Sequence, residues 1–400
     1  MKIKKKVFLW LLLVIPFFYP NSIAGTLMAT IWHQWKIVAV LMCGVYIFQN
    51  FKRLKYLEKV TWVIILFYIM QIIATRINKI DITYDLKTAI MMSCFVIVIS
   101  LIVYKEGNEG ILFFYQLLHM LVWLNFASVI LFYGEGIVRD SYDTAVYFWS
   151  TKNHIISITL AYLVIAYYIF NEGYIVKRKY WMGVIASIVA VFLMGSSTAI
   201  AALFVYGVFI FCCNICGKKG RIVNMKMAVV IGILADIAIV VFRIQERLGG
   251  IISKVFGKDT TLTGRTDLWD QALELVGINT WFGKGNSYAL NQYGWLTKQY
   301  WNSGTQTLED VYFVSHNQFL EIMVNGGLIC LIPFIGIFYW LIQSAKRIQN
   351  SKYKMIIGAA LIAYFIAMIT DLITPYEPVY LFIIVASYIY KCENTNAGGI

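Results

Sequence analysis

Long apolar runs follow one another along most of this 400-residue chain, and they constrain its fold more than any other feature. A helix needs roughly 20 apolar residues to cross about 30 Å of hydrocarbon. We count twelve candidate spans, some of them short, at residues 7–21, 36–51, 60–76, 88–104, 110–133, 154–170, 180–196, 198–213, 225–242, 316–343, 353–371 and 376–391. Because 60% of the residues are hydrophobic and only 14% are charged, we predict an all-α, polytopic membrane protein with about twelve transmembrane helices.

Lysine and arginine are distributed unevenly between alternate loops. Twenty-one of them fall in the loops on one side of the predicted bundle, and six fall in the short loops on the other side. Since cytoplasmic loops carry the excess of positive charge, both termini are expected in the cytoplasm and the long segment 243–315 outside. This distribution accounts for the net charge of +13 without a nucleic-acid partner.

The N-terminus and the cysteines indicate how the chain is placed in the cell, and they do not indicate a catalytic site. Residues 1–20 resemble a signal peptide but lack a small-residue cleavage site, so we expect an uncleaved first helix. The seven cysteines lie inside apolar runs or beside basic loops, and none lies in a predicted outer loop. We therefore expect no disulfides. Cys213 and Cys216 form a lone CxxC motif without a partner pair, so a zinc site is not expected there.

The pattern divides the chain into three parts: transmembrane helices over 1–242, one long external loop over 243–315 and three further transmembrane helices over 316–400. The external loop contains an amphipathic helix, because apolar residues recur at three- and four-residue spacing after Asp267. This helix could lie on the membrane surface or cap the bundle. The loop continues through turn-forming glycines at Gly283 and Gly285.

Residues 286–310 are dense in tyrosine, tryptophan, asparagine and glutamine. Aromatic residues of this kind often lie at the level of the lipid headgroups. They also suit the recognition of sugars, because aromatic faces stack on C–H faces while amides bond to hydroxyl groups. The two interpretations are compatible, and the sequence leaves both open.

Two residues at the edges of the external loop could carry chemistry. Arg265 follows a glycine and opens the amphipathic helix, where free backbone N–H groups and a guanidinium together suit a phosphate. The simpler alternative is an arginine that reaches the lipid headgroups. His316 stands where the chain re-enters the membrane, and a neutral imidazole can accept a proton from an attacking hydroxyl. Its simpler alternative is an interfacial histidine without a role.

Further polar residues gather at the same predicted face. Asn317, Glu321 and Asn325 are spaced by four and share one side of a helix, and polar groups at membrane depth usually point into the bundle or a wet cavity. The other candidates near the outer face are Lys152, Asn153, His154, Arg243, Arg247, Asp371 and Glu377, with Asp236 nearer the middle of its span. Together they favour an anionic headgroup as the ligand. The outer loops hold no cluster with metal-ligand spacing, and neither a metal nor another cofactor is expected.

At these residues the sequence resembles the bacterial family of O-antigen ligases and O-antigen or capsular polysaccharide polymerases, which are membrane glycosyltransferases. The strong resemblance covers about 65 residues, and elsewhere it is one of topology. The matching elements are Gly264-Arg265 with Trp269 and Ala272, Gly283-x-Gly285, His316-Asn317 with Glu321, Gly326-Gly327-Leu328 and, more weakly, Lys152-Asn153.

The resemblance implies a GT-C-like fold and an inverting, metal-independent transfer at the outer face of the bacterial cytoplasmic membrane. The donor would be an undecaprenyl-diphosphate-linked oligosaccharide, with Arg265 on the diphosphate and His316 activating the acceptor hydroxyl. Asn317, Glu321, Arg243, Arg247, Lys152, Asn153 and Trp269 would bind substrate. The expected partners are the lipid bilayer, a chain-length regulator and a flippase. A polymerase for capsule, exopolysaccharide or O-antigen is the leading interpretation. A ligase with another acceptor is the close alternative, and a flippase or transporter of lipid-linked oligosaccharides is the alternative from another class.

One departure from the family pattern affects the diphosphate site. Members often carry Ser-Arg at the hairpin between the spans at 180–196 and 198–213, where this chain reads Gly195-Ser196-Ser197-Thr198. The missing arginine leaves the site with fewer cations, unless Arg243, Arg247 or Lys152 supplies the charge.

The predicted orientation can be tested with reporter fusions. An enzyme that is active only outside the cytoplasm should be active when fused after Trp295 and silent when fused after Gly220, because the charge bias places these positions on opposite sides. The reverse pattern would place the predicted catalytic residues in the cytoplasm and contradict the interpretation.

Overall fold

The structure is a computed structural model of the chain, and it describes residues 5–140, 143–215, 225–247, 264–290, 292–302, 307–373 and 376–397. Within these ranges, each of the twelve apolar runs coincides with an α-helix. The helices are α1 (Lys5–Val14), α2 (Leu27–Gln49), α3 (Lys59–Ile77), α4 (Thr83–Glu106), α5 (Asn108–Leu131), α6 (Ile155–Asn171), α7 (Lys177–Met194), α8 (Ser197–Ile215), α10 (Met225–Val240), α14 (Gln318–Lys346), α15 (Ser351–Thr370) and α16 (Glu377–Ala397).

Not every one of these helices is long and apolar enough to cross a membrane on its own. Seven within the described residues are: α2, α3, α4, α5, α8, α14 and α15. The stretch Lys6–Phe17, α6 and the stretch Met227–Val240 are apolar but shorter. The protein is thus a helical, multi-pass membrane protein, and the number of twelve crossings stays a prediction.

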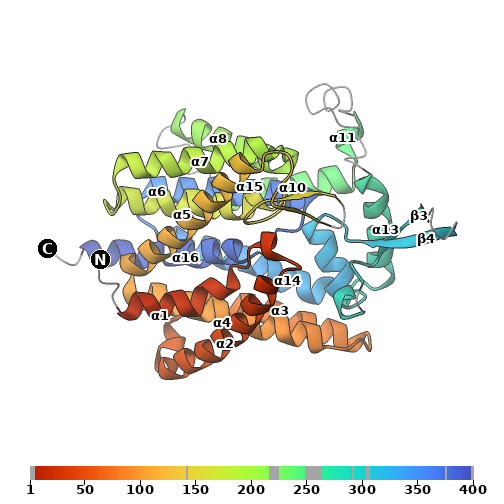
Figure 1. Cartoon of the computed structure of the whole chain (residues 1–400), viewed down its shortest axis with the longest axis horizontal. Coiled ribbons are helices and arrows are strands. Elements are labelled where there is room, and N and C mark those ends of the chain that lie inside the picture. Colours follow the sequence, from red (N-terminus) through yellow and green to blue (C-terminus); the bar gives the residue numbers. More distant parts are fainter. Residues whose placement is uncertain are drawn as a thin grey trace.

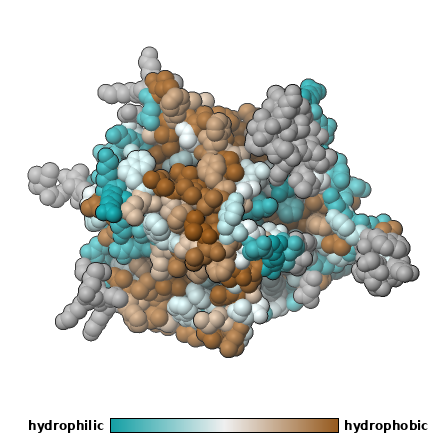
Figure 2. Space-filling model, turned by 45° about the horizontal axis from the view of Figure 1, so that its top comes forward, coloured by the Kyte–Doolittle hydropathy of each residue, from teal (hydrophilic) through white to brown (hydrophobic). Residues whose placement is uncertain are grey.

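The helices lie roughly side by side along the long axis of the molecule (Figure 1). α15 packs against α6, α8 and α10, while α14 packs against α3 and α16. α1 begins and α16 ends at the same end of the bundle, opposite to α13 (Arg265–Ile278) and the β3–β4 hairpin. Figure 2 shows an apolar band across the middle of the visible face, with hydrophilic side chains toward both ends. This arrangement fits a bundle that crosses a bilayer and carries its loop segment on one side.

The described part of the 243–315 segment is only partly helical. After α11 (Ile244–Arg247) and α13, a 3-10 turn η4 (Ser287–Leu290) leads to an antiparallel hairpin of β3 (Leu296–Asn302) and β4 (Thr307–Phe313). A second, two-residue hairpin joins β1 (Val138–Arg139) to β2 (Ala145–Val146) ahead of α6. Neither hairpin was predicted. Threonine, tyrosine and tryptophan in 296–301 are residue types that favour strands, but a cluster of aromatic residues beside predicted membrane helices also resembles an aromatic belt at the membrane surface.

The amphipathic helix α13 caps the bundle. Its apolar face, with Leu268, Trp269 and Ala272 buried, forms one cluster with Val240 at the end of α10 and with side chains from β3 and α14. Its outer face is tied to the hairpin by Gln271, whose side chain exchanges two hydrogen bonds of 3.0 Å with the backbone of Thr297 on β3. α13 therefore holds the loop against the first turns of α14.

Helix α14 is broken at Gly327, where the loop docks onto it through the backbone. Gly327 has φ +61° and ψ −162°, a conformation that only glycine adopts readily. Around this break the N–H groups of Lys284 and Gly285 donate to the carbonyls of Val324 and Asn325 at 2.7 and 2.9 Å. The freed N–H groups of the helix donate back to the loop, from Leu328 to Thr280 and from Ile329 to Trp281.

Both glycine motifs are needed for this close approach. A Cβ on Gly283 would lie 2.6 Å from the carbonyl oxygen of Val324, and a Cβ on Gly327 would lie 2.4 Å from the backbone of Trp281. The Gly283-x-Gly285 turn and the Gly326-Gly327 pair are thus two halves of one contact. Non-helical backbone at this depth is tolerated because it is buried in protein and its polar groups are paired.

Gly327→Ala is expected to destabilise the protein by at least about 1–3 kcal/mol, because alanine is strained at this φ and its Cβ meets the Trp281 backbone. The thermal unfolding midpoint of detergent-solubilised protein measures the effect. Gly207→Ala on α8 is the matched control, since a Cβ there meets nothing within 4 Å and its midpoint should not fall. Equal midpoints for the two variants would contradict the docking role.

Candidate functional site

The chain enters α14 through a tight turn that fixes the direction of His316. His316 has φ +50°, a left-handed conformation that costs a non-glycine residue about 1–3 kcal/mol. Buried neighbours hold it: the Ser315 N–H donates to Glu321 Oε2 at 2.7 Å, and the Ser315 hydroxyl donates to the Asn317 carbonyl at 2.9 Å. The Asn317 side-chain oxygen accepts from the Leu320 N–H at 2.9 Å and caps the helix. These hydrogen bonds offset the backbone strain at His316.

Asn317 also joins three helices beneath the turn. Its Nδ2 group donates to Asp236 Oδ1 on α10 at 2.6 Å and to the Ile369 carbonyl on α15 at 3.1 Å. With its oxygen on α14, this one fully buried side chain ties α10, α14 and α15 together directly beside His316.

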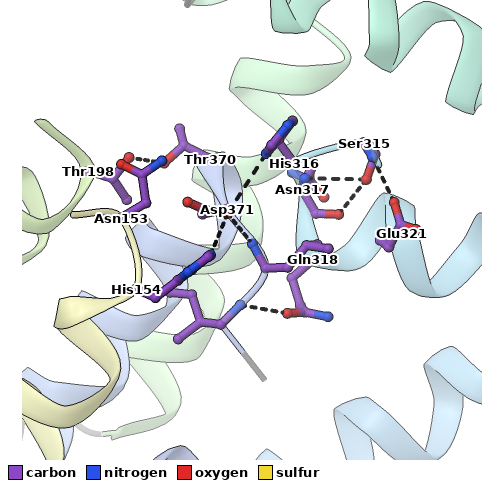
Figure 3. Close-up of polar contacts among 12 residues, drawn as sticks. Asn153, His154, Thr198, Ser315, His316, Asn317, Gln318, Glu321, Thr370 and Asp371 are labelled. Atoms are coloured by element: carbon purple, nitrogen blue, oxygen red, sulfur yellow. Dashed lines mark hydrogen bonds and ion pairs between the residues drawn. The ribbon is translucent and has the colours of Figure 1, made fainter. Parts of the chain in front are cut away.

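Asp371, the first residue after α15, lies between two imidazole rings (Figure 3). Its Oδ1 atom is 3.6 Å from Nε2 of His154 and 3.8 Å from Nδ1 of His316. Burial alone would raise the pKa of Asp371, but the two imidazoles outweigh burial and hold that pKa well below its usual value. Asp371 therefore keeps a negative charge at neutral pH.

This charge determines how His316 can act. Nδ1 of His316 is buried and faces Asp371, while the side chain as a whole is 28% exposed. The carboxylate favours the ring proton on Nδ1, so Nε2 of the neutral ring is the proton acceptor. His154 begins α6 on the other side of Asp371, and its Nδ1 is 2.6 Å from the hydroxyl of Tyr376.

His316 lines a cationic cavity of about 330 Å³. Three cations from separate elements line it: Lys152 ahead of α6, Arg265 at the start of α13 and Lys298 on β3. No carboxylate is among the lining residues in the part of the chain that the structure describes. The other lining residues are Asn153, the Gly195–Thr198 hairpin, Leu268, Tyr300 and Phe313. We call this space the cationic cavity.

Arg265 is the cation best placed for an anionic ligand. Its guanidinium has no hydrogen-bond or ion-pair partner among the residues that the structure describes, and burial lowers its pKa against the opposing charge of Asp371. A guanidinium with a lowered pKa remains charged at neutral pH. Lys298 reaches the same place, where its Nζ donates to the Gly264 carbonyl at 2.7 Å and lies 3.8 Å from Asp267. The first N–H groups of α13 add donors there.

A second cavity of about 340 Å³ lies against the other side of His316. It shares Asn153, Phe313 and His316 with the cationic cavity, but its remaining lining differs in chemistry. The described residues of that lining are Asp140, Thr144, Thr151, His154, Tyr288, Tyr293, Val314, Asp371, Leu372 and Tyr376, and none of these is a lysine or arginine. We call this space the acidic cavity.

The structure thus brings together four of the residues expected from sequence: Lys152, Asn153, Arg265 and His316 line the cationic cavity. The other predicted ligands line neither cavity. Asn317 and Glu321 support the turn from within the protein. Trp269, Arg243 and Arg247 are described next.

Trp269 and Arg243 hold α13 in place. Trp269 is fully buried, and its indole N–H donates to the Ser315 carbonyl at 3.0 Å. Arg243 pairs with Asp270, donates to the Thr266 carbonyl at 3.1 Å and lies over the Trp269 ring. Arg247 is exposed at the end of the described part of this segment. A substrate-binding role for these three residues stays a prediction.

Sequence reasoning did not assign site roles to His154, Asp371, Lys298 or the tyrosines of the acidic cavity. His154 and Asp371 were noticed at the outer face, but 217 positions separate them and only the fold shows that they meet. Lys298 could have been found from the alternation in β3, which places it on the same side as Tyr300. The Gly195–Thr198 hairpin that lacks the family arginine does line the cationic cavity, and Lys152 and Lys298 supply charge there.

Comparisons with known proteins cover the region that contains this site. Residues 182–335 match the family model described as O-antigen ligase, a region that contains Arg265, His316 and the Gly195–Thr198 hairpin. The exopolysaccharide production protein ExoQ of Rhizobium meliloti is 32% identical over 149 residues, which span 32% of this chain and 31% of that protein. No solved structure matches. These matches support the resemblance seen in the sequence: the chain is a multi-pass membrane protein whose residues 182–335 are similar to the O-antigen ligase family.

Proposed function

We propose that the protein is a polysaccharide polymerase that transfers an undecaprenyl-diphosphate-linked glycan to a sugar hydroxyl at the outer face of the cytoplasmic membrane. The observation that carries the proposal is the position of His316 between a cationic cavity and an acidic, tyrosine-rich cavity. A glycosyl transferase of this kind needs a phosphate site, a sugar site and a base between them.

The cationic cavity suits the diphosphate of the donor. Arg265 offers a planar fork of donors at the N-terminus of a 14-residue helix, where backbone N–H groups and the helix dipole also favour an anion. Lys152 and Lys298 add two point charges from other elements. The described lining residues include three cations, and the carboxylate of Asp267 lies 3.8 Å from Lys298.

The reaction we propose is a direct displacement with inversion. The acceptor hydroxyl oxygen attacks C1 of the lipid-linked sugar and forms the new C1–O bond. The bond from C1 to the phosphate oxygen breaks, and undecaprenyl diphosphate leaves with the electron pair. The hydroxyl proton passes to Nε2 of His316. Because the diphosphate is already a good leaving group, the main task of the protein is to activate the hydroxyl, and a positioned base contributes roughly 10²–10⁴-fold.

Asp371 acts through His316 in this scheme. A negative charge 3.8 Å from Nδ1 orients the ring and stabilises the imidazolium that forms when Nε2 takes the proton. The buried turn at Ser315 and Asn317 holds the ring at the boundary of both cavities. Asp371 and Asn317 are therefore positioning residues.

A ligase that passes the glycan to another acceptor would use the same site, and the family description favours it as the second candidate. The products separate the two: a polymerase yields a ladder of repeat units on one lipid, whereas a ligase yields a single transfer. A flippase is disfavoured because the distinctive residues gather at one end of the bundle rather than near its middle. A separate flippase and a chain-length regulator are the partners that a polymerase would need.

Arg265→Lys should lose most of the glycan product although it keeps the charge, because lysine cannot grip a diphosphate through two parallel hydrogen bonds. The measurement is polymer formed in cells at matched expression. Arg178→Lys is the control, since this exposed arginine begins α7, about 27 Å of helix away from the hairpin at Gly195. An unchanged amount of product from Arg265→Lys would contradict diphosphate binding by Arg265 and would favour a role at the lipid headgroups.

His316→Ala should lower the rate of transfer by roughly 10²–10⁴-fold, because the hydroxyl then lacks its base. The assay is elongation of lipid-linked repeat units by purified protein, with EDTA in all samples. A near wild-type rate for His316→Ala would assign the base to another residue. Loss of wild-type activity in EDTA would contradict the metal-independent mechanism.

A further inference from the structure

We propose that the acidic cavity is the subsite of the acceptor sugar and that it selects a sugar ring without a negative charge. The identification of the bound sugar as the acceptor rests on the proposed function. The binding of a neutral sugar ring there does not depend on transfer.

The geometry places an acceptor in this cavity. His316, Asn153 and Phe313 line both cavities, so the two spaces adjoin at the proposed base and at these two neighbours. Because His316 lines both spaces, a hydroxyl bound in the acidic cavity lies against the same imidazole as a diphosphate bound in the cationic cavity. A volume of about 340 Å³ accommodates one or two sugar rings.

The aromatic lining suits a sugar ring. Tyr288 and Tyr293 meet edge to face with centroids 6.1 Å apart, and Tyr288 stacks on Tyr84 of α4 at 5.7 Å. This arrangement presents rigid rings with hydroxyl groups at their rims, which give large contact areas at a small entropic cost. Tyr376 lies at the same cavity and its hydroxyl is held 2.6 Å from His154 Nδ1.

The charge of the lining provides the selection. Among the residues that the structure describes, Asp371 and Asp140 line the acidic cavity without a lysine or arginine, whereas three cations line the cationic cavity without a carboxylate. Carboxylates accept hydrogen bonds from sugar hydroxyls or from an amino sugar, but they repel a uronate or a phosphate. The cationic cavity therefore favours the diphosphate of the donor, and the acidic cavity favours an uncharged sugar of the acceptor.

The experiment measures binding of four probes to the purified full-length protein by saturation-transfer NMR. The probes are the methyl glycosides of glucose, galactose, N-acetylglucosamine and glucuronic acid. At least one neutral glycoside is expected to bind at millimolar concentration, with glucuronide binding at least roughly threefold weaker. Failure of all neutral probes to bind, or equal binding of the glucuronide, would overturn the proposal.

Two variants locate the binding. Tyr293→Ala should weaken the neutral glycoside roughly three- to tenfold, because it removes one ring of the lining. Tyr312→Ala is the matched control, an exposed tyrosine on β4 that lines neither cavity, and should leave binding unchanged. Equal effects of the two changes would place the sugar elsewhere.

A third variant tests the charge itself. In the wild-type protein the Thr144 N–H donates to Asp140 Oδ1 at 2.8 Å. Asp140→Asn keeps a side-chain oxygen that can accept this hydrogen bond but removes the negative charge. It should narrow the preference for the neutral glycoside over the glucuronide, and an unchanged preference would contradict the electrostatic selection. Because no transfer is measured, failure of these tests is distinct from failure of the proposed function, which the Arg265 and His316 variants test.

Discussion

The site depends on a break in a membrane helix whose freed backbone groups are paired with a loop. At Gly327 the helix α14 leaves its regular hydrogen-bond pattern, and residues 280–285 take up the free carbonyl and N–H groups around the break. An unpaired backbone group at this depth would cost several kcal/mol. Displacement of residues 280–285 would therefore leave those backbone groups unpaired. Helix α13 ends just before this segment, at Ile278, and is thereby fixed over the start of α14.

The turn that carries His316 likewise pairs its buried polar groups within the protein. Asn317, Ser315 and Glu321 hold their own polar atoms in hydrogen bonds within the protein. Their position next to His316 in the sequence made them candidates for substrate binding, but the fold directs them inward. What remains for substrate is the exposed part of His316 and the other lining residues of the two cavities, which come from several separate parts of the chain.

The sequence predicted the helices well because each transmembrane helix satisfies its own backbone, so an apolar run alone determines where it forms. It also predicted that Arg265 and His316 belong to one site, through a local motif that families share. It did not predict the β3–β4 hairpin, whose aromatic residues fit two structures equally. Nor did it predict the pairing of Asp371 with His154 and His316, because charges far apart in sequence meet only through the packing of α6, α14 and α15.

Opposite charge in two adjoining cavities addresses a difficulty peculiar to polymerisation. If both substrates are lipid-linked glycans, both carry the same diphosphate group, and the protein must distinguish the end that leaves from the end that attacks. Like charges repel each other, and the repulsion is stronger in a partly buried site than in water. Under the proposed function, a diphosphate would be repelled on the side of Asp371 and attracted on the side of Arg265. A sugar end would then present its hydroxyl to His316 from the acidic side, and the placement of fixed charges would set the direction of chain growth.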